Sequence, residues 1–361
     1  MNIVANAVPF VIGVDTHARS HALSILVAAT GVVIDEAQFP TSRAGMARAI
    51  DWAARRTGGD LQVLWVIECV ATYGAGLAAA VTRAGYQAVE AARMNAGTQR
   101  GVGKSDPLDA RRIAAAVIPL EVDQLRHPRQ HDGIRAALRT LVAARDMMTN
   151  ERTAMINALT ALLRHTPLDV DARKPLTGTQ IATIAHWRTR TEDIATATAR
   201  AEATRLARRI TALTHEITDN TATTTQLIKQ SPARELLNTT GIGPVTAAVV
   251  MTAWSHPGRL RNEAAFASLA GVNPIPASSG NTIRHRLNRG GDRRLNQALH
   301  MAVITRMTHD PDTRHYVERR RAEGRTTREI RRILKRYLAR HLYRLITRTA
   351  TNNPTQAAQT A

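Results

Sequence analysis

The sequence reads VIGVD at residues 11–15 and VLWVIE at residues 63–68, two apolar runs that each end in a carboxylate. Short apolar runs of this kind are typical of buried β-strands. A third stretch, KSDPLDARR at residues 104–112, holds two aspartates three positions apart, and residues three apart on a helix share a face. Acids at two strand ends and on one helical turn can converge on one point. The four carboxylates are those of Asp15, Glu68, Asp106 and Asp109.

The segments around the first two acids predict an α/β domain. In chain order they predict strands at 9–17, 21–28 and 31–39, a helix at 43–56, a strand at 62–68, a helix at 74–84 and a strand at 86–91. A three-stranded meander followed by helix, strand, helix and strand is the layout of a ribonuclease H-like domain. The first and fourth strands are neighbours in that layout, so we expect Asp15 to lie close to Glu68.

The other two acids have two interpretations. Asp106 is expected to be the N-cap of a helix, with Pro107 at the first helical position and Asp109 at the third. Acids at a helix N-terminus stabilise the helix without any metal, and for an isolated Asp-Pro-x-Asp this capping role is the commoner one. The strand-end acids upstream shift the balance towards a shared catalytic centre.

A cluster of carboxylates with no Cys or His nearby favours a hard, oxygen-loving cation such as Mg²⁺ or Mn²⁺. Two such cations can hold the attacking and leaving oxygens of a phosphodiester. The four acids are therefore expected to be both catalytic and metal-binding.

The composition indicates a polyanionic partner. The chain has 361 residues, a net charge of +20 and a sequence pI of about 11.4, which suits DNA or RNA phosphates. An anionic membrane is the rival partner, but no apolar run reaches the ~20 residues of a membrane span and no signal pattern precedes the first strand. The single cysteine, Cys69, excludes an internal disulfide and a cysteine-based zinc site. We expect a bacterial cytoplasmic, nucleoid-associated protein without a membrane partner.

The chain is too long for one compact core and is expected to form several domains. The predicted boundaries are 8–125 for the α/β catalytic domain, 126–230 for a helical coiled-coil or oligomerisation region, 231–348 for a mostly α-helical C-terminal domain and 349–361 for a disordered tail. The middle region carries a thin apolar stripe, at 134–163 and again at 181–217. Such a stripe often needs a partner chain to cover it, so we expect at least a dimer.

The C-terminal domain carries candidate nucleic-acid contacts. LNTTGIGPVT at 237–246 resembles a helix-hairpin-helix, in which Gly241 and Gly243 would let backbone N–H groups meet a phosphate, although the same pattern also forms plain turns. Residues 314–348 hold thirteen Arg or Lys and three Glu, half of the net charge, and are read as a phosphate-tracking helix rather than a docked helix with a solvated face. The residues expected to contact phosphates are Lys104, Gly241, Gly243, Arg331, Arg332, Lys335 and Arg336.

Two other patterns carry little weight. GVGKS at 101–105 is similar to the end of a P-loop, but Thr98 stands where that motif needs its first Gly, so we interpret it as a loop whose Lys104 meets a phosphate. The doublet Ser278-Ser279 has no base nearby in the sequence, and such a doublet by itself is usually a loop.

Taken together, these motifs resemble the transposases of the insertion-sequence-110 family, which includes the Piv-type DNA invertases. The resemblance covers about residues 9–120 and 231–325. It rests on the KSDPLDA stretch at 104–110, on LLNTTGIG at 236–243, on FASLAGVNP at 266–274 and on GGDRRL at 290–295. The first part is similar to that family's RuvC-like domain, whose Asp-Glu-Asp-Asp set falls on Asp15, Glu68, Asp106 and Asp109.

The resemblance implies a serine nucleophile that acts with the metal-bound acids. It falls on Ser279, with Ser278 as the second choice, and Ala277 stands where the family usually has an aromatic residue. It further implies donor and target DNA as substrates, a structured non-coding guide RNA, and dimers that pair into tetramers. Two alternatives stay open: a metal-dependent junction resolvase or nuclease that uses water, and a binding protein without activity.

Overall fold

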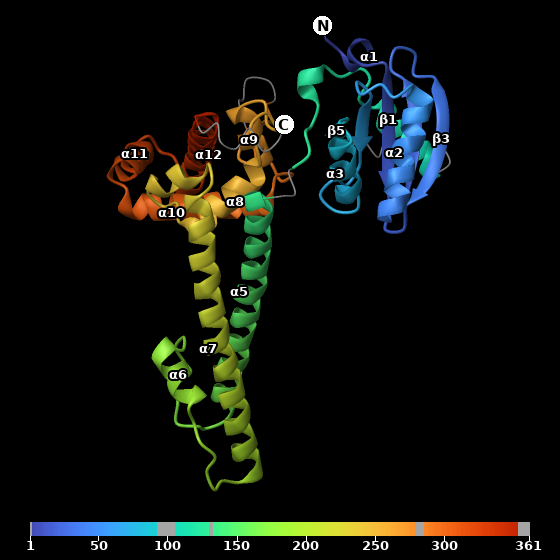
Figure 1. Ribbon diagram of the computed structural model, residues 1–361. Helices are drawn as coiled ribbons and strands as arrows, with labels where there is room; N and C mark the ends of the chain where they lie inside the picture. Colours follow the sequence, from blue (N-terminus) through green and yellow to red (C-terminus); the bar gives the residue numbers. More distant parts are fainter. Residues whose placement is uncertain (1, 92–104, 130–132, 279–284, 353–361) are drawn as a thin grey trace. The chain divides into compact units, whose positions relative to one another are not determined.

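The computed structural model describes residues 2–91, 105–129, 133–278 and 285–352 (Figure 1). The chain divides into two compact units. The first combines residues 1–131, 254–290 and 339–351, and the second combines 132–253, 291–338 and 352–361. No helix in the described ranges is long and apolar enough to cross a membrane.

The N-terminal segment of the first unit forms a five-stranded mixed sheet. Its strands are β1 (Phe10–Thr16), β2 (Ser20–Val27), β3 (Val33–Pro40), β4 (Leu64–Ile67) and β5 (Gln87–Glu90), in the order β3-β2-β1-β4-β5. The first three strands pair antiparallel, whereas β1–β4 and β4–β5 pair parallel. This confirms the expected ribonuclease H-like α/β fold and the expected contact between the first and fourth strands.

Apolar clusters cover both faces of this sheet. On one face Ile12 and Trp65 join residues of α2 (Arg43–Thr57) and α3 (Ala75–Arg83). On the other face Val11 and Val66 join residues of α1 (Val4–Ala7), α4 (Asp106–Ala115) and the segment that precedes the 3₁₀ helix η2 (Val122–Gln124). Side chains alternate along a strand, so odd-numbered positions of β1 and even-numbered positions of β4 face α4.

The middle of the chain is a helical hairpin. α5 (Gly133–His165) and α7 (Ile194–Lys229) lie side by side, and α6 (Gly178–Ala185) packs near their distal end (Figure 1). The apolar stripe is buried mainly within the chain itself, in a cluster that includes Leu159, Ile184, Leu206 and Ile210. The expectation that another chain must cover the stripe is wrong for these residues, because the hairpin and α6 cover them. Oligomerisation stays a prediction from the family resemblance alone.

The C-terminal part is mostly helical. Its elements are η3 (Arg234–Asn238), α8 (Pro244–Trp254), α9 (Glu263–Leu269), β6 (Ile275–Pro276), β7 (His285–Arg286), α10 (Arg293–His309), α11 (Pro311–Ala322) and α12 (Thr327–Thr351). The basic segment 314–348 is thus divided between two helices, because Gly324 takes a left-handed backbone conformation with φ +80°. The tail was expected to be disordered from residue 349, but α12 continues to Thr351.

Candidate active site

Asp15 lies at the end of β1 on the face that α4 covers, because it alternates with Val11 and Gly13. Its side chain is 8% exposed. Glu68 follows β4 directly, and its backbone N–H donates to the Val14 carbonyl at 3.0 Å, which extends the β1–β4 pairing by one residue. Two neighbouring parallel strands therefore end in carboxylates at the same edge of the sheet.

The approach of α4 to this edge depends on Gly13. A Cβ at that position would lie 2.0 Å from the Ala110 carbonyl oxygen and 2.6 Å from the Ala114 backbone nitrogen. The helix backbone therefore lies directly against β1, and only glycine leaves room for it. This close contact brings the first turn of α4, which carries Asp106 and Asp109, to the strand ends.

We expect Gly13→Ala to destabilise the α/β domain by about 1–3 kcal/mol or more, because the new methyl group must displace the backbone of α4. Urea unfolding followed by circular dichroism measures this. Gly76→Ala is the matched control with the opposite sign: its Cβ would meet only the Met46 side chain at 3.5 Å, and alanine is the better helix former. Equal stability of Gly13→Ala and the unsubstituted protein would contradict the close approach.

The first turn of α4 differs slightly from the expectation. The N-cap is Ser105 rather than Asp106, so Asp106 is the first helical residue, and Ser105 makes no side-chain cap hydrogen bond. One Asp109 oxygen accepts a hydrogen bond from Arg112 at 3.0 Å, and the Asp109 side chain is 15% exposed. Asp106 is therefore not the N-cap, although both acids stand in the first turn, where a carboxylate also interacts favourably with the helix dipole.

A histidine that the sequence interpretation passed over joins these acids. The Nε2 atom of His17 lies 3.1 Å from Asp15 Oδ2 and 3.4 Å from Asp106 Oδ1. One ligand atom from each of the three residues lies within 4.8 Å of the others, a spacing that can hold a metal ion. The expectation of a cluster with no Cys or His nearby is wrong, because His17 stands two residues beyond Asp15 and the exposed Cys69 follows Glu68. The two-residue period of a strand was the signal that could have found His17.

The electrostatics of Glu68 link it to the same cluster. Burial is the main cause that raises the pKa of its carboxyl group, and the neighbouring Asp15 and Asp109 raise it further, whereas His17 opposes the shift. All four predicted acids thus lie close to at least one other member of the set. The neighbouring acids thus disfavour the charged form of Glu68, and a bound divalent cation would offset that repulsion. The donor set therefore fits a divalent metal ion.

Ser279, the predicted nucleophile, lies outside the described residues, as does Lys104. Ser278 is exposed and stands at the end of the described segment. On either side, β6 and β7 pair antiparallel, with Ile275 opposite Arg286. The side chain of Asn288 fixes the base of this pair: it donates to Asn273 Oδ1 at 2.7 Å and accepts from the Gly290 N–H at 2.9 Å. The two serines therefore belong to the segment that joins two paired strands.

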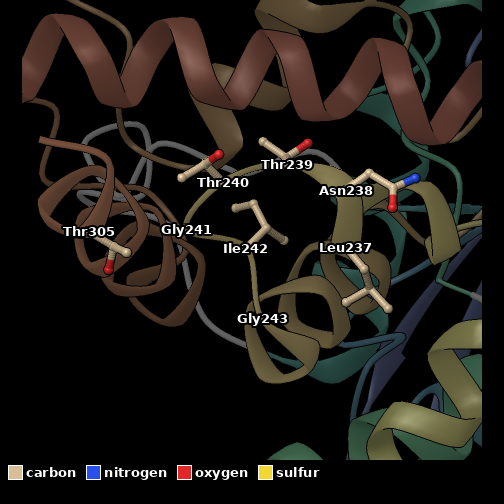
Figure 2. Close-up of a pocket in the computed structure, with 8 residues that line it drawn as sticks. All are labelled: Leu237, Asn238, Thr239, Thr240, Gly241, Ile242, Gly243 and Thr305. Carbon is tan, nitrogen blue, oxygen red and sulfur yellow. The ribbon is translucent and has the colours of Figure 1, made fainter. Parts of the chain in front are cut away.

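The turn between η3 and α8 forms an open pocket of about 550 Å³, lined by residues 237–243 and Thr305 (Figure 2). Gly241 has φ +83°, and a Cβ there would lie 2.7 Å from the Ala302 carbonyl oxygen of α10. Arg306 of α10 donates to the Thr240 carbonyl at 3.3 Å. Packing against α10 thus accounts for Gly241, whereas a Cβ on Gly243 would meet open space. Phosphate binding by this turn stays a prediction.

The four basic residues expected to track phosphates on α12 separate into two groups. Arg332 and Arg336 are exposed. Lys335 is half-buried, its Nζ donates to Asn296 Oδ1 at 2.9 Å, and burial together with Arg332 lowers its pKa. The Nε of Arg331 is buried and has no hydrogen-bond partner among the described residues. Of these four residues, Arg332 and Arg336 can contact a phosphate without a change in the position of α12.

We expect Arg332→Gln with Arg336→Gln to weaken nucleic-acid binding and to reduce the slope of log affinity against log salt by ~0.7–0.9 for each lost phosphate contact. Fluorescence anisotropy over a series of salt concentrations measures the slope. Arg188→Gln with Arg190→Gln, an equal loss of charge in an exposed segment after α6, is the control and should leave the slope unchanged. The same slope for both double variants would place the nucleic acid elsewhere.

Comparison with known proteins gives two family matches. A model described as Transposase, for the DEDD transposases of IS110, matches residues 12–167, which contain all four acids. A model described as Transposase IS116/IS110/IS902 family matches residues 233–318, which contain both serines. Together the matched segments cover about two thirds of the chain.

Two similar proteins come from insertion elements. The IS900 uncharacterized 42 kDa protein of Mycobacterium paratuberculosis is 28% identical, over 74% of this chain and 78% of its own. The IS110 uncharacterized 43.6 kDa protein of Streptomyces coelicolor is 37% identical over 87 residues, which make up 24% of this chain and 22% of its own.

Proposed function

The chain belongs to the IS110 family of transposases, and from that premise we propose that it cuts and rejoins DNA at a centre formed by Asp15, Glu68, Asp106 and Asp109. One observation supports the proposal most strongly. Asp15 and Glu68, at the ends of β1 and β4, lie next to the first turn of α4, the helix that covers this face of the sheet. His17 joins Asp15 to Asp106, and Glu68 interacts with Asp15 and Asp109.

The four acids would hold Mg²⁺ or Mn²⁺, because carboxylate oxygens are the ligands that these cations prefer. A bound divalent ion would stabilise the negative charge that develops on the scissile phosphate. The protein's own contribution is to fix the carboxylates before the substrate arrives. Asp15 and Glu68 are fixed by β1–β4 pairing, and Asp106 and Asp109 are fixed by the close contact of α4 with Gly13.

We further propose that Ser279 is the nucleophile, a role that comes from the family resemblance. Its Oγ forms a bond to the phosphorus, and the bond from phosphorus to the 3′ oxygen breaks. The serine proton passes to a nearby base, and the leaving oxygen takes a proton to become a free 3′-hydroxyl. In the second step a 3′-hydroxyl of another strand attacks the phosphoserine, and Ser279 regains its proton. The number of phosphodiester bonds is conserved, so strand exchange needs no nucleotide cofactor.

The partners that we propose are donor DNA, target DNA and a structured guide RNA, bound by a homodimer or tetramer. The net charge of +20 supports a polyanionic partner, and the exposed Arg332 and Arg336 support contacts on α12. The guide RNA and the oligomer rest on the resemblance to the family. We place the protein with the nucleoid in the bacterial cytoplasm, where such a reaction takes place.

The test is a cleavage assay with end-labelled element-end DNA, the cognate RNA and Mg²⁺, resolved on a denaturing gel before and after protease digestion. We expect a labelled band that carries covalently bound protein and shifts after protease treatment. Cut DNA without any protein-linked band would instead support the junction-resolving nuclease, because hydrolysis leaves no adduct.

A further inference from the structure

We propose that His17 is itself a metal ligand, so that the centre is a mixed nitrogen and oxygen site that prefers Mn²⁺ to Mg²⁺. The inference rests on the proposed function, because it assumes that the acids bind a divalent ion. It adds a fifth protein ligand to the four acids and makes a specific statement about which ion the centre takes.

The geometry at His17 fits a ligand position. Metal–oxygen bonds of about 2.1 Å place adjacent ligands of an octahedral site roughly 3 Å apart. The separations of His17 Nε2 from Asp15 Oδ2 and from Asp106 Oδ1 are 3.1 and 3.4 Å, close to that spacing. The Asp15 and Asp106 oxygens lie within 4.8 Å of each other, so they would have to move towards each other for the three atoms to form one face of an octahedron.

Packing does not explain why the imidazole stands there. The His17 side chain is 48% exposed, so no core holds it in place. Its backbone is fixed instead, because the His17 N–H donates to the Ser20 carbonyl at 3.0 Å in the turn between β1 and β2. His17 is the first residue after β1, and its side chain lies on the same side as that of Asp15, two residues earlier. Although half of the His17 side chain is exposed to solvent, it lies between the carboxylates of Asp15 on β1 and Asp106 on α4.

The alternative to metal ligation is an ion pair, in which a protonated His17 only neutralises Asp15 and Asp106. The two alternatives differ in what the nitrogen does when a cation is present. A ligand keeps its Nε2 lone pair on the ion, whereas an ion-pair partner is displaced by the ion's positive charge. A direct measurement of metal–nitrogen bonding therefore separates them.

The choice of ion follows from ligand chemistry. Imidazole nitrogen suits transition metals, and affinity for a nitrogen-containing site rises along the series from Mn²⁺ onwards, whereas Mg²⁺ strongly prefers oxygen and water. Loss of the imidazole should therefore weaken Mn²⁺ binding by about tenfold or more and leave Mg²⁺ binding nearly unchanged.

The experiment is pulsed electron paramagnetic resonance of Mn²⁺ bound to the untagged full chain, because a histidine tag would bind the ion itself. The unsubstituted protein should show nitrogen hyperfine coupling from a directly bound imidazole. His17→Gln should bind Mn²⁺ more weakly and lose this coupling. His186→Gln is the control, since this exposed histidine lies at the end of α6, and it should keep both. Competition with Mg²⁺ in each variant gives the preference for the ion.

Asp15→Asn is included to separate two kinds of failure. If the unsubstituted chain binds Mn²⁺ without nitrogen coupling, and Asp15→Asn loses binding, His17 is not a ligand and the acidic centre stands. If the unsubstituted chain binds neither ion, with or without duplex DNA, both the acidic centre and the role of His17 are overturned. Nitrogen coupling that survives in His17→Gln would also overturn the inference.

Discussion

Asp15→Asn should reduce DNA cleavage and strand exchange by at least about 10²-fold. Charge stabilisation by a catalytic metal ion contributes several kcal/mol, and each ~1.4 kcal/mol corresponds to a factor of ten in rate. Asp15 lies beside His17 and raises the pKa of Glu68, so it takes part in both halves of the cluster. Its amide analogue keeps the shape but loses the charge. Cleavage of labelled DNA in single-turnover conditions measures the effect.

The same variant should fold normally, and this distinguishes a lost ligand from a lost structure. The Asp15 carboxylate raises the pKa of Glu68, so its removal relieves repulsion between like charges. We expect thermal unfolding without divalent ions to occur at the same temperature or a higher one. Asp51→Asn, an exposed acid on α2, is the control and should keep full activity. Full activity of Asp15→Asn would rule out the acidic centre.

The order of the strands could be predicted from the sequence because hydrophobic patterning is strong in this domain. β1 and β4 are apolar almost throughout and are buried on both faces, which is what a central strand requires. The meander before the first helix followed from the short connections. Once those strands were neighbours, the proximity of Asp15 and Glu68 followed, because both are strand-end residues on the same side.

The sequence did not reveal how the helix reaches these acids. In the sequence, Gly13 looks like an ordinary small residue within a strand. The structure shows that a side chain there would clash with the backbone of α4. The motif of four acids gives no reason to expect a histidine, although His17 stands two residues after Asp15 and lies beside it. The cover of the helical stripe was also not predictable, because it depends on how α6 folds back on the hairpin, a non-local contact that a linear pattern does not record.

The sequence also did not predict which side chains of the basic helix α12 face solvent. The charge density of residues 314–348 indicated a nucleic-acid surface, but composition does not tell which side of a helix faces inwards. Lys335 is directed towards Asn296 of α10, whereas Arg332 is exposed. Long basic side chains often place their apolar stems against a core and only their charged ends in water, so counting charge overstates the phosphate-facing surface.

Ser279→Ala should abolish the covalent protein–DNA adduct and reduce recombination by at least about 10³-fold, because a nucleophile that forms a covalent intermediate has no substitute in that step. Folding and DNA affinity should stay unchanged, since the change removes one hydroxyl group. The adduct is measured by the protease-sensitive band, and recombination is measured by a product-specific amplification from donor and target plasmids.

Ser278→Ala is the natural control, because it removes the same hydroxyl one residue away, and its effect should be mild. Because the acids alone can activate water, residual nicking without an adduct is expected in Ser279→Ala, and Asp15→Asn should remove that nicking too. If instead Ser278→Ala is inactive while Ser279→Ala recombines normally, the serine chemistry holds and the nucleophile is the neighbouring residue. If both single variants and the double variant recombine at the normal rate, no serine in this segment attacks the phosphate. Water or a DNA 3′-hydroxyl would then be the nucleophile, held by the same four acids.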